Sequence, residues 1–134
     1  MYCAEAPTGA LLETLVHLEV ESLDELPRTN QLLRIAFPAG ATFEEVEVAS
    51  LPSDWKRRTL LTRSIGDAWL AAGRTVALRV PSAISPYAFN VLLNPQLLAG
   101  TGVRIVAKSR HPFNARPFKS VQSGSRARGR ARRR

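Results

Sequence analysis

A glutamate and a histidine stand four residues apart in the apolar stretch GALLETLVHL near the start of the chain. That spacing places Glu13 and His17 on one face of a helix, where His17 could serve as a catalytic base. Because leucines occupy much of the remaining circumference, we expect this helix to be largely buried and Glu13 to be withdrawn from solvent. The alternatives are a surface Glu–His pair and, for His17, an imidazole that packs in the core or orients another group.

Three polar side chains interrupt the core-forming stretch LRVPSAISPYAFNVLLNP at residues 78–95, namely Ser82, Asn90 and Asn94. Each needs a hydrogen-bond partner if it is buried, because an unpaired buried polar group costs about 1–3 kcal/mol. Ser82 follows Pro81, where a serine commonly bonds the backbone of a turn, and Asn94 before Pro95 is a good turn initiator. The sequence therefore leaves two interpretations open: these side chains hold turns, or they face a ligand.

Most of the net positive charge of the chain lies at its end. The net charge of the 134 residues is +8, and residues 119–134, KSVQSGSRARGRARRR, carry seven cations and no acid, so that residues 1–118 retain only +1. Ser, Gly and Arg without apolar periodicity predict a disordered basic tail. Such a tail can bind phosphate backbones through counterion release. Nucleic-acid binding thus stays open as a function, although no groove-reading element accompanies the charge.

The composition of residues 1–118 is that of one globular domain. No apolar run approaches the roughly 20 residues of a membrane span, and the start MYCAEAPTG lacks a secretory signal. A single cysteine, Cys3, excludes an internal disulfide and offers no metal cluster. Neither a glycine-rich phosphate loop nor zinc-ligand spacing nor a nucleophile elbow is present. These features favour a cytoplasmic protein and leave out the usual enzyme signatures.

The elements that must position these residues form an α+β pattern. Thr8 can cap a first helix at 8–19, and Gly73 can end a second at 59–72, where apolar residues recur at helical spacing. The β-forming stretches are 31–37, 44–51, 75–81, 89–94 and 103–109. Because strands and helices do not alternate strictly, the pattern argues against a doubly wound sheet. We therefore expect a small mixed or antiparallel sheet with two main helices.

Taken together, the motifs resemble the RES-domain family, the toxins of bacterial RES–Xre toxin–antitoxin pairs. The resemblance covers residues 2–118 and is carried by these segments in order: Tyr2-x-Ala4-Glu5, LLETLVHL, LPSDWKRR, IGDAWL, LRVPSAISPYAFNVLLNP and PFNAR. It implies a fold like that of ADP-ribosyltransferases of the diphtheria-toxin type. It also implies consumption of NAD by hydrolysis, phosphorolysis or transfer of ADP-ribose to a protein.

The resemblance assigns the family glutamate to Glu13 and the family serine to Ser82. Glu13 would stabilise the positive charge that develops on the ribose. The same comparison implies that Ser82 binds the nicotinamide amide or a phosphate, that Tyr2 stacks on the nicotinamide ring, and that Asn90 braces the NAD pocket. NAD is expected as substrate, with no metal. The implied partner is an Xre-type helix-turn-helix antitoxin, with no membrane partner, and a homo-oligomer is left open.

The sequence departs from the family pattern at one point. The family arginine lies upstream of the strand that contains Tyr2, and none of Arg28, Arg34 and Arg79 occupies the matching position. The expectation is therefore a toxin domain that is truncated at its N-terminus. Two functional hypotheses follow, an active NAD-consuming toxin and an inactive remnant that still binds the antitoxin. A nucleic-acid-binding protein that acts through residues 119–134 is the third.

Overall fold

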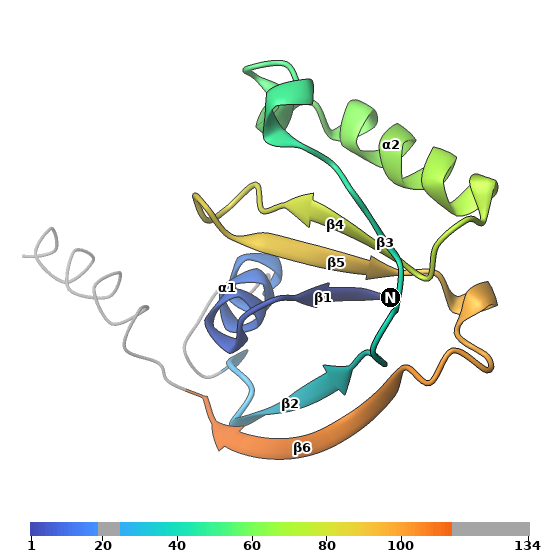
Figure 1. Cartoon of the computed structure of the whole chain (residues 1–134). Helices are drawn as coiled ribbons and strands as arrows, with labels where there is room; N and C mark the ends of the chain where they lie inside the picture. The colour runs from blue at the N-terminus through green and yellow to red at the C-terminus, as the bar shows by residue number, and fades with distance from the viewer. Residues whose placement is uncertain (19–24, 114–134) are drawn as a thin grey trace, which may run out of the picture.

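A four-stranded sheet lies between a long helix and a two-stranded ribbon (Figure 1). This is a computed structural model that describes residues 1–18 and 25–113. The sheet has the order β1-β5-β4-β3, and β2 pairs with β6 in the separate ribbon. The strands are β1 Tyr2–Ala4, β2 Thr29–Ala36, β3 Phe43–Glu45, β4 Ala77–Pro81, β5 Phe89–Leu93 and β6 Arg104–Pro112. The helices are α1 Pro7–His17 and α2 Thr59–Ala72, with short 3-10 helices at Val48–Ser50, Trp55–Arg57 and Pro95–Leu97.

The four-stranded sheet is mixed. β3 and β4 run parallel, joined by the crossover through α2, whereas β4 pairs with β5 and β5 with β1 in antiparallel register. Together with the two helices, this arrangement confirms the expected α+β class.

The two faces of the sheet bury different sets of residues. On one face Ala77, Val91 and Leu93 form a cluster with Val76, against which the half-buried Ile35 of β2 also packs. On the other face lies α2, whose Gly66 approaches the Leu92 side chain closely enough that an added Cβ would lie 3.8 Å from Leu92 Cδ1. Two tryptophans, Trp55 and Trp69, are 8% and 4% exposed and belong to the core. The sheet is thus covered on both sides.

Three sequence expectations about the elements are wrong, and one strand, β1, was implied by the family resemblance but not by periodicity. The strand expected at 44–51 ends at Glu45 and gives way to a 3-10 turn. β1 adds a strand to those read from periodicity, because three residues are too few for a visible alternation. α1 is preceded by Ala6 as its N-cap, with Pro7 in the first turn, so Thr8 does not cap it. No residue of α1 is fully buried, because it lies against β1 at the border of the sheet instead of under a second layer.

Two further expectations concern the C-terminal tail and the absence of a membrane-spanning segment. The predicted basic tail at 119–134 lies outside the described residues, so the domain boundary at 118 stays a prediction. Within the described segments, neither helix has the length and apolar character needed to cross a bilayer.

Candidate active site

One carboxylate oxygen collects three hydrogen bonds at the edge of the sheet. Glu13 Oε1 accepts from Asn90 Nδ2 at 2.8 Å, from Ser82 Oγ at 3.3 Å and from the Tyr2 hydroxyl at 3.4 Å. The Glu13 side chain is only 14% exposed. The structure therefore brings together all four residues that the sequence singled out for the site, from α1, β1, β5 and the loop after β4.

The pairing of β1 with β5 places Tyr2 and Asn90 beside each other. Tyr2 lies opposite Leu92, and Ala4 lies opposite Asn90, so that both polar side chains belong to the same face of the sheet. Asn90 is 2% exposed, and its Nδ2 also donates to the Tyr2 hydroxyl at 2.5 Å. Both amide hydrogens are thus used within the site. Asn90 contacts the carboxylate directly, whereas the sequence suggested a more distant bracing role.

Ser82 fulfils both of the roles that the sequence left open. Its Oγ accepts the backbone N–H groups of Ile84 and Ser85 at 3.2 and 3.1 Å, which is the bonding of a serine turn. The same hydroxyl donates its single hydrogen to Glu13. Ser82 therefore fixes the loop after β4 and the carboxylate together. Asn94 lies apart from the site: its Oδ1 accepts from Gln96 N and caps the 3-10 helix, as expected of a turn initiator.

The Tyr2 hydroxyl is held in its protonated form. Burial raises the pKa of Tyr2 to about 12, and the negative charge of Glu13 and the hydrogen bond to it act in the same direction, while the bond from Asn90 opposes them. Tyr2 therefore stays a hydrogen-bond donor to Glu13 at neutral pH. Its residue as a whole is 52% exposed, so the ring borders solvent while the hydroxyl points to the carboxylate.

The second oxygen of Glu13 is free for other contacts. Within the described segments Oε2 lies near one charged or chargeable group, His17 Nε2 at 3.8 Å, which is beyond hydrogen-bond distance. The His17 side chain is 77% exposed, so the expectation of an imidazole packed in the core is wrong. His17 projects to the surface from the last turn of α1. A ligand can therefore reach both Oε2 and the imidazole.

Two cavities meet at Tyr2. One, of about 440 Å³, is lined by Tyr2, Cys3, Ala4, Ala10, Glu13, Thr14, His17 and Leu18. The other, of about 380 Å³, lies between α2 and the sheet and includes Trp55, Arg63, Asp67 and Leu92 in its wall. Burial raises the pKa of the Cys3 thiol, which keeps it protonated at neutral pH and argues against a nucleophilic thiolate. Both volumes suit small-molecule sites.

The sequence reasoning missed the second cavity. Arg63 and Asp67 stand four residues apart on α2, the same spacing that drew attention to Glu13 and His17. That signal was present, but a charged pair on an amphipathic helix most often faces solvent. Only the packing of α2 over the sheet shows that these two side chains border a cavity.

Comparison with known proteins gives a consistent result. The model of the RES domain family matches residues 1–115. The chain is 40% identical over 96 residues to a Toxin Res of Pseudomonas putida and 38% identical over 97 residues to a Toxin Res of Photorhabdus laumondii. It is 32% identical over 108 residues to a Prs ADP-ribosylating toxin of a Sphingobium species. These matches cover 72%, 71% and 78% of the chain and 64%, 60% and 65% of the three relatives, so the chain spans less than two thirds of their length.

Proposed function

Because the chain belongs to the RES domain family, we propose that it is a toxin domain that consumes NAD by breaking the bond between nicotinamide and ribose. The relatives named Toxin Res support the toxin function, and the relative named an ADP-ribosylating toxin supports NAD as substrate, because NAD is the donor of ADP-ribose in such transfers. That name also agrees with the expected ADP-ribosyltransferase-like fold.

The observation that carries the proposal is the asymmetry of the Glu13 carboxylate. Oε1 is fixed by three donors, and Oε2 faces the cavity that Glu13 shares with Tyr2 and His17. A carboxylate held in one orientation can accept a ribose hydroxyl and stabilise positive charge on the sugar without reorganising. It does so in a partly dry site, where its charge acts more strongly than in water.

The proposed reaction begins with heterolysis of the bond between ribose C1′ and the nicotinamide nitrogen. The electron pair of that bond passes to the nitrogen, and neutral nicotinamide leaves. The sugar carries the positive charge, which Glu13 stabilises. An acceptor then bonds to C1′ and loses a proton, and whether it is water, phosphate or a protein side chain decides between hydrolysis, phosphorolysis and ADP-ribosylation.

The other site residues receive distinct roles in this proposal. The exposed Tyr2 ring stacks on the nicotinamide, since Tyr2 borders both cavities and its hydroxyl is engaged by Glu13. Ser82 and Asn90 position the carboxylate: their hydrogens are committed to Glu13 and Tyr2, so they act through those groups instead of on the substrate. No metal is required, because the carboxylate supplies the charge that the reaction needs.

We also propose a partner and a compartment for the toxin. A domain that destroys NAD in its own cell needs neutralisation, and we propose an Xre-type helix-turn-helix antitoxin, with both proteins in the cytoplasm where NAD is available. The candidate antitoxin to test is the product of a helix-turn-helix gene adjacent to the gene for this chain. Its co-expression should restore cell growth, and the two proteins should co-purify. Toxicity that no co-expressed antitoxin relieves would contradict this part of the proposal.

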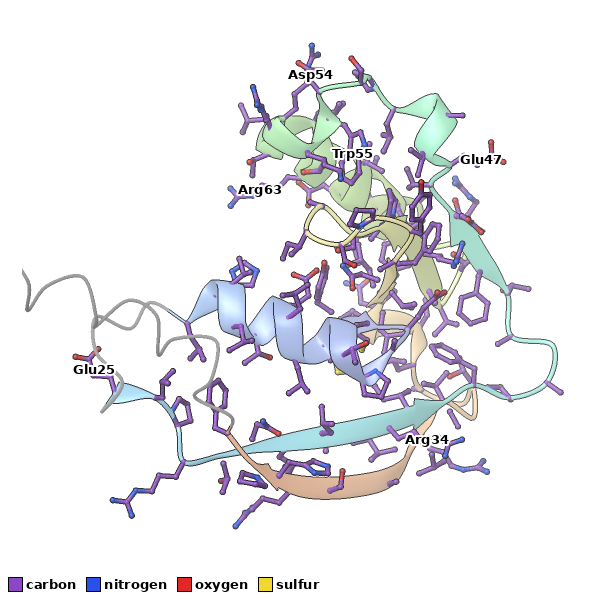
Figure 2. The ribbon with its side chains drawn as sticks, turned by 90° about the vertical axis from the view of Figure 1, so that its left-hand side faces the viewer. Glu25, Arg34, Glu47, Asp54, Trp55 and Arg63 are labelled. Carbon is purple, nitrogen blue, oxygen red and sulfur yellow. The ribbon has the colours of Figure 1, made fainter. Side chains whose placement is uncertain are left out.

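The proposed activity is tested by following NAD loss in purified protein, with and without phosphate. Glu13→Gln should reduce the rate by about 100-fold or more, because it removes the negative charge while keeping the shape. The matched control is Glu47→Gln, an exposed carboxylate before the 3-10 turn and well away from α1 (Figure 2). No NAD loss from folded wild-type protein would reject the activity, and antitoxin binding by that sample would favour the inactive remnant.

A further inference from the structure

The cavity beside α2 has a mainly apolar wall and two exposed charged residues at its border. Its wall consists mainly of apolar side chains from α2, the sheet and the segment before α2, among them Val46, Leu51, Trp55, Ile65, Leu70, Val80 and Leu92. Two charged side chains, Arg63 and Asp67, complete the wall, and both residues are exposed. An apolar pocket with a few charged groups at its rim is the usual form of a small-molecule site.

These two charges differ from three arginines nearby that are each paired with a carboxylate. Arg58 pairs with Asp54, Arg74 pairs with Glu44, and Arg79 pairs with both Glu5 and Glu45. Over residues 1–18 and 25–113, by contrast, the side chains of Arg63 and Asp67 make no hydrogen bond and no ion pair, even with each other. An unpaired cation and an unpaired anion beside one cavity are both available to a ligand.

The cavity continues the proposed active site. Tyr2 borders it on one side and borders the Glu13 cavity on the other. In the view of Figure 2, Arg63 lies above α1, the helix that carries Glu13, whereas Arg34 lies below it on the β2–β6 ribbon. A long ligand can therefore reach from Glu13 past the Tyr2 ring to Arg63.

We infer that this cavity receives the adenosine diphosphate half of NAD, with the Arg63 guanidinium on the diphosphate and the Asp67 carboxylate on the hydroxyls of the adenine-bearing ribose. The inference rests on the proposed function, because it assigns the second half of the same substrate. A guanidinium binds phosphate oxygens through two parallel hydrogen bonds. The apolar wall accepts the adenine ring, and Trp55 supplies an aromatic surface within it.

The sign of the charge at Asp67 selects between two related substrates. A carboxylate accepts hydrogen bonds from free ribose hydroxyls but repels a phosphate at the 2′ position. A site that contains Asp67 next to the ribose therefore takes NAD and disfavours NADP.

The experiment measures the binding of ADP, which lacks the nicotinamide half and so reports on this cavity alone. Isothermal titration of wild type, Arg63→Gln, Asp67→Asn and the control Arg34→Gln is compared with the binding of adenosine. Arg34 is an exposed arginine outside both cavities. We expect Arg63→Gln to weaken ADP binding by about 10- to 100-fold while leaving adenosine binding within about two-fold. Wild type should bind ADP more tightly than adenosine 2′,5′-bisphosphate. Asp67→Asn should reduce this ratio of affinities, because the amide no longer repels the 2′-phosphate.

The outcomes separate this inference from the proposed function. Loss of ADP binding in Arg63→Gln but not in Arg34→Gln supports the assignment, even if NAD is not consumed. Active NAD consumption with ADP affinity unchanged in Arg63→Gln would overturn the assignment and leave the activity standing. Equal losses of ADP affinity in Arg63→Gln and Arg34→Gln would mean that only the net charge of the protein matters, and would reject the site. Absence of ADP binding to wild type would reject it as well.

Discussion

At the scale of single residues, the donors around Glu13 also determine which substitutions the site tolerates. Asn90→Asp replaces the closest donor with a second carboxylate, 2.8 Å from Glu13 Oε1 at a position that is 2% exposed. Two carboxylates this close cannot both ionise, so the pair retains a proton above the usual carboxyl range. We expect NAD consumption to fall by about 100-fold and the free energy of unfolding at pH 8 to fall by about 3 kcal/mol.

The pH dependence of that variant has a defined sign. The folded pair binds its proton more tightly than the unfolded carboxyls, so stability is retained at acidic pH and lost as pH rises through the raised pKa. In urea unfolding, the loss of unfolding free energy of Asn90→Asp relative to wild type should therefore be smaller at pH 5 than at pH 8. Gln31→Glu, on the exposed outer face of the ribbon, is the control. A deficit independent of pH would mean that the new carboxylate does not interact with Glu13.

The Tyr2 hydroxyl gives a spectroscopic readout of the same contact. The chain has two tyrosines, so Tyr87→Phe leaves Tyr2 as the sole tyrosinate signal. In that background the pKa of Tyr2 should be about 12. Burial is the largest cause of this raised pKa and the charge of Glu13 the next, so adding Glu13→Gln should lower the pKa part of the way back to 10. The Tyr2 phenol loses its proton at lower pH in the unfolded chain than in the folded one. The free energy of unfolding therefore falls as pH rises from about 10 to about 12. An absorbance titration by rapid mixing measures both pKa values, and an unchanged pKa would contradict the Tyr2–Glu13 contact.

Sequence reasoning reached the identity of the site residues but not their bonding. The apolar surroundings of Ser82 and Asn90 predicted that both need partners, and both are buried. Their shared partner could not be predicted, because Glu13 lies 69 and 77 positions away and one hydroxyl can serve a turn and a carboxylate at once. Residue type limits how many hydrogen bonds a side chain can make, whereas tertiary packing decides with which groups.

At the scale of elements, the far face of the sheet carries a charged clamp, centred on Arg79, that ties the segment before α1 to β4 and β3. Arg79 on β4 bonds Glu5, which lies between β1 and α1, and Glu45 at the end of β3, and its guanidinium stacks 3.4 Å above the Phe89 ring. Glu5 directly precedes the helix that carries Glu13. The clamp therefore ties the entry of α1 to the central strand.

Removing the clamp should loosen α1 more than it destabilises the fold. Arg79→Met should lower the free energy of unfolding by about 1 kcal/mol, since the pairs are partly exposed, and should reduce NAD consumption several-fold through misplacement of Glu13. Arg79→Lys should restore little, because an ammonium cannot form the bidentate contact with Glu5. Urea unfolding measures the change in stability of both variants, and NAD assays measure the change in activity. Arg34→Met is the control. Equal activity in Arg79→Met and wild type would show that α1 is held by other contacts.

The elements differ in how far their sequence determines them. α2 was predicted at its observed bounds, because its apolar residues repeat at helical spacing and Gly73 adopts the left-handed conformation, with φ of 57°, that ends a helix. α1 was expected to be largely buried, yet Leu12 and Val16 are 36% and 55% exposed, and α2 likewise exposes Leu60 at 82%. Periodicity identifies a helix, but the number of layers packed against it depends on topology. The parallel pairing of β3 with β4 likewise follows from the α2 crossover and not from strand composition.

At the scale of the whole molecule, the excess positive charge and the candidate active site lie in different segments. Residues 1–118 have a net charge of +1, and residues 119–134 contribute the rest. Deleting 119–134 should abolish salt-dependent binding to a DNA or RNA oligonucleotide, because that binding depends on the number of phosphates neutralised. NAD consumption should persist. Anisotropy titrations at several salt concentrations test the first part, and loss of activity on deletion would place part of the site in the tail.

The long separation between Glu13 and its donors also has a consequence during synthesis. The carboxylate leaves the ribosome early, whereas Asn90 follows 77 residues later on a strand that must then receive β1. Contacts so distant along the chain form late in folding. Glu13 and Asn90 can therefore come together only after β5 has been made, and every shorter nascent chain lacks the hydrogen-bonded carboxylate that we propose as the catalytic group.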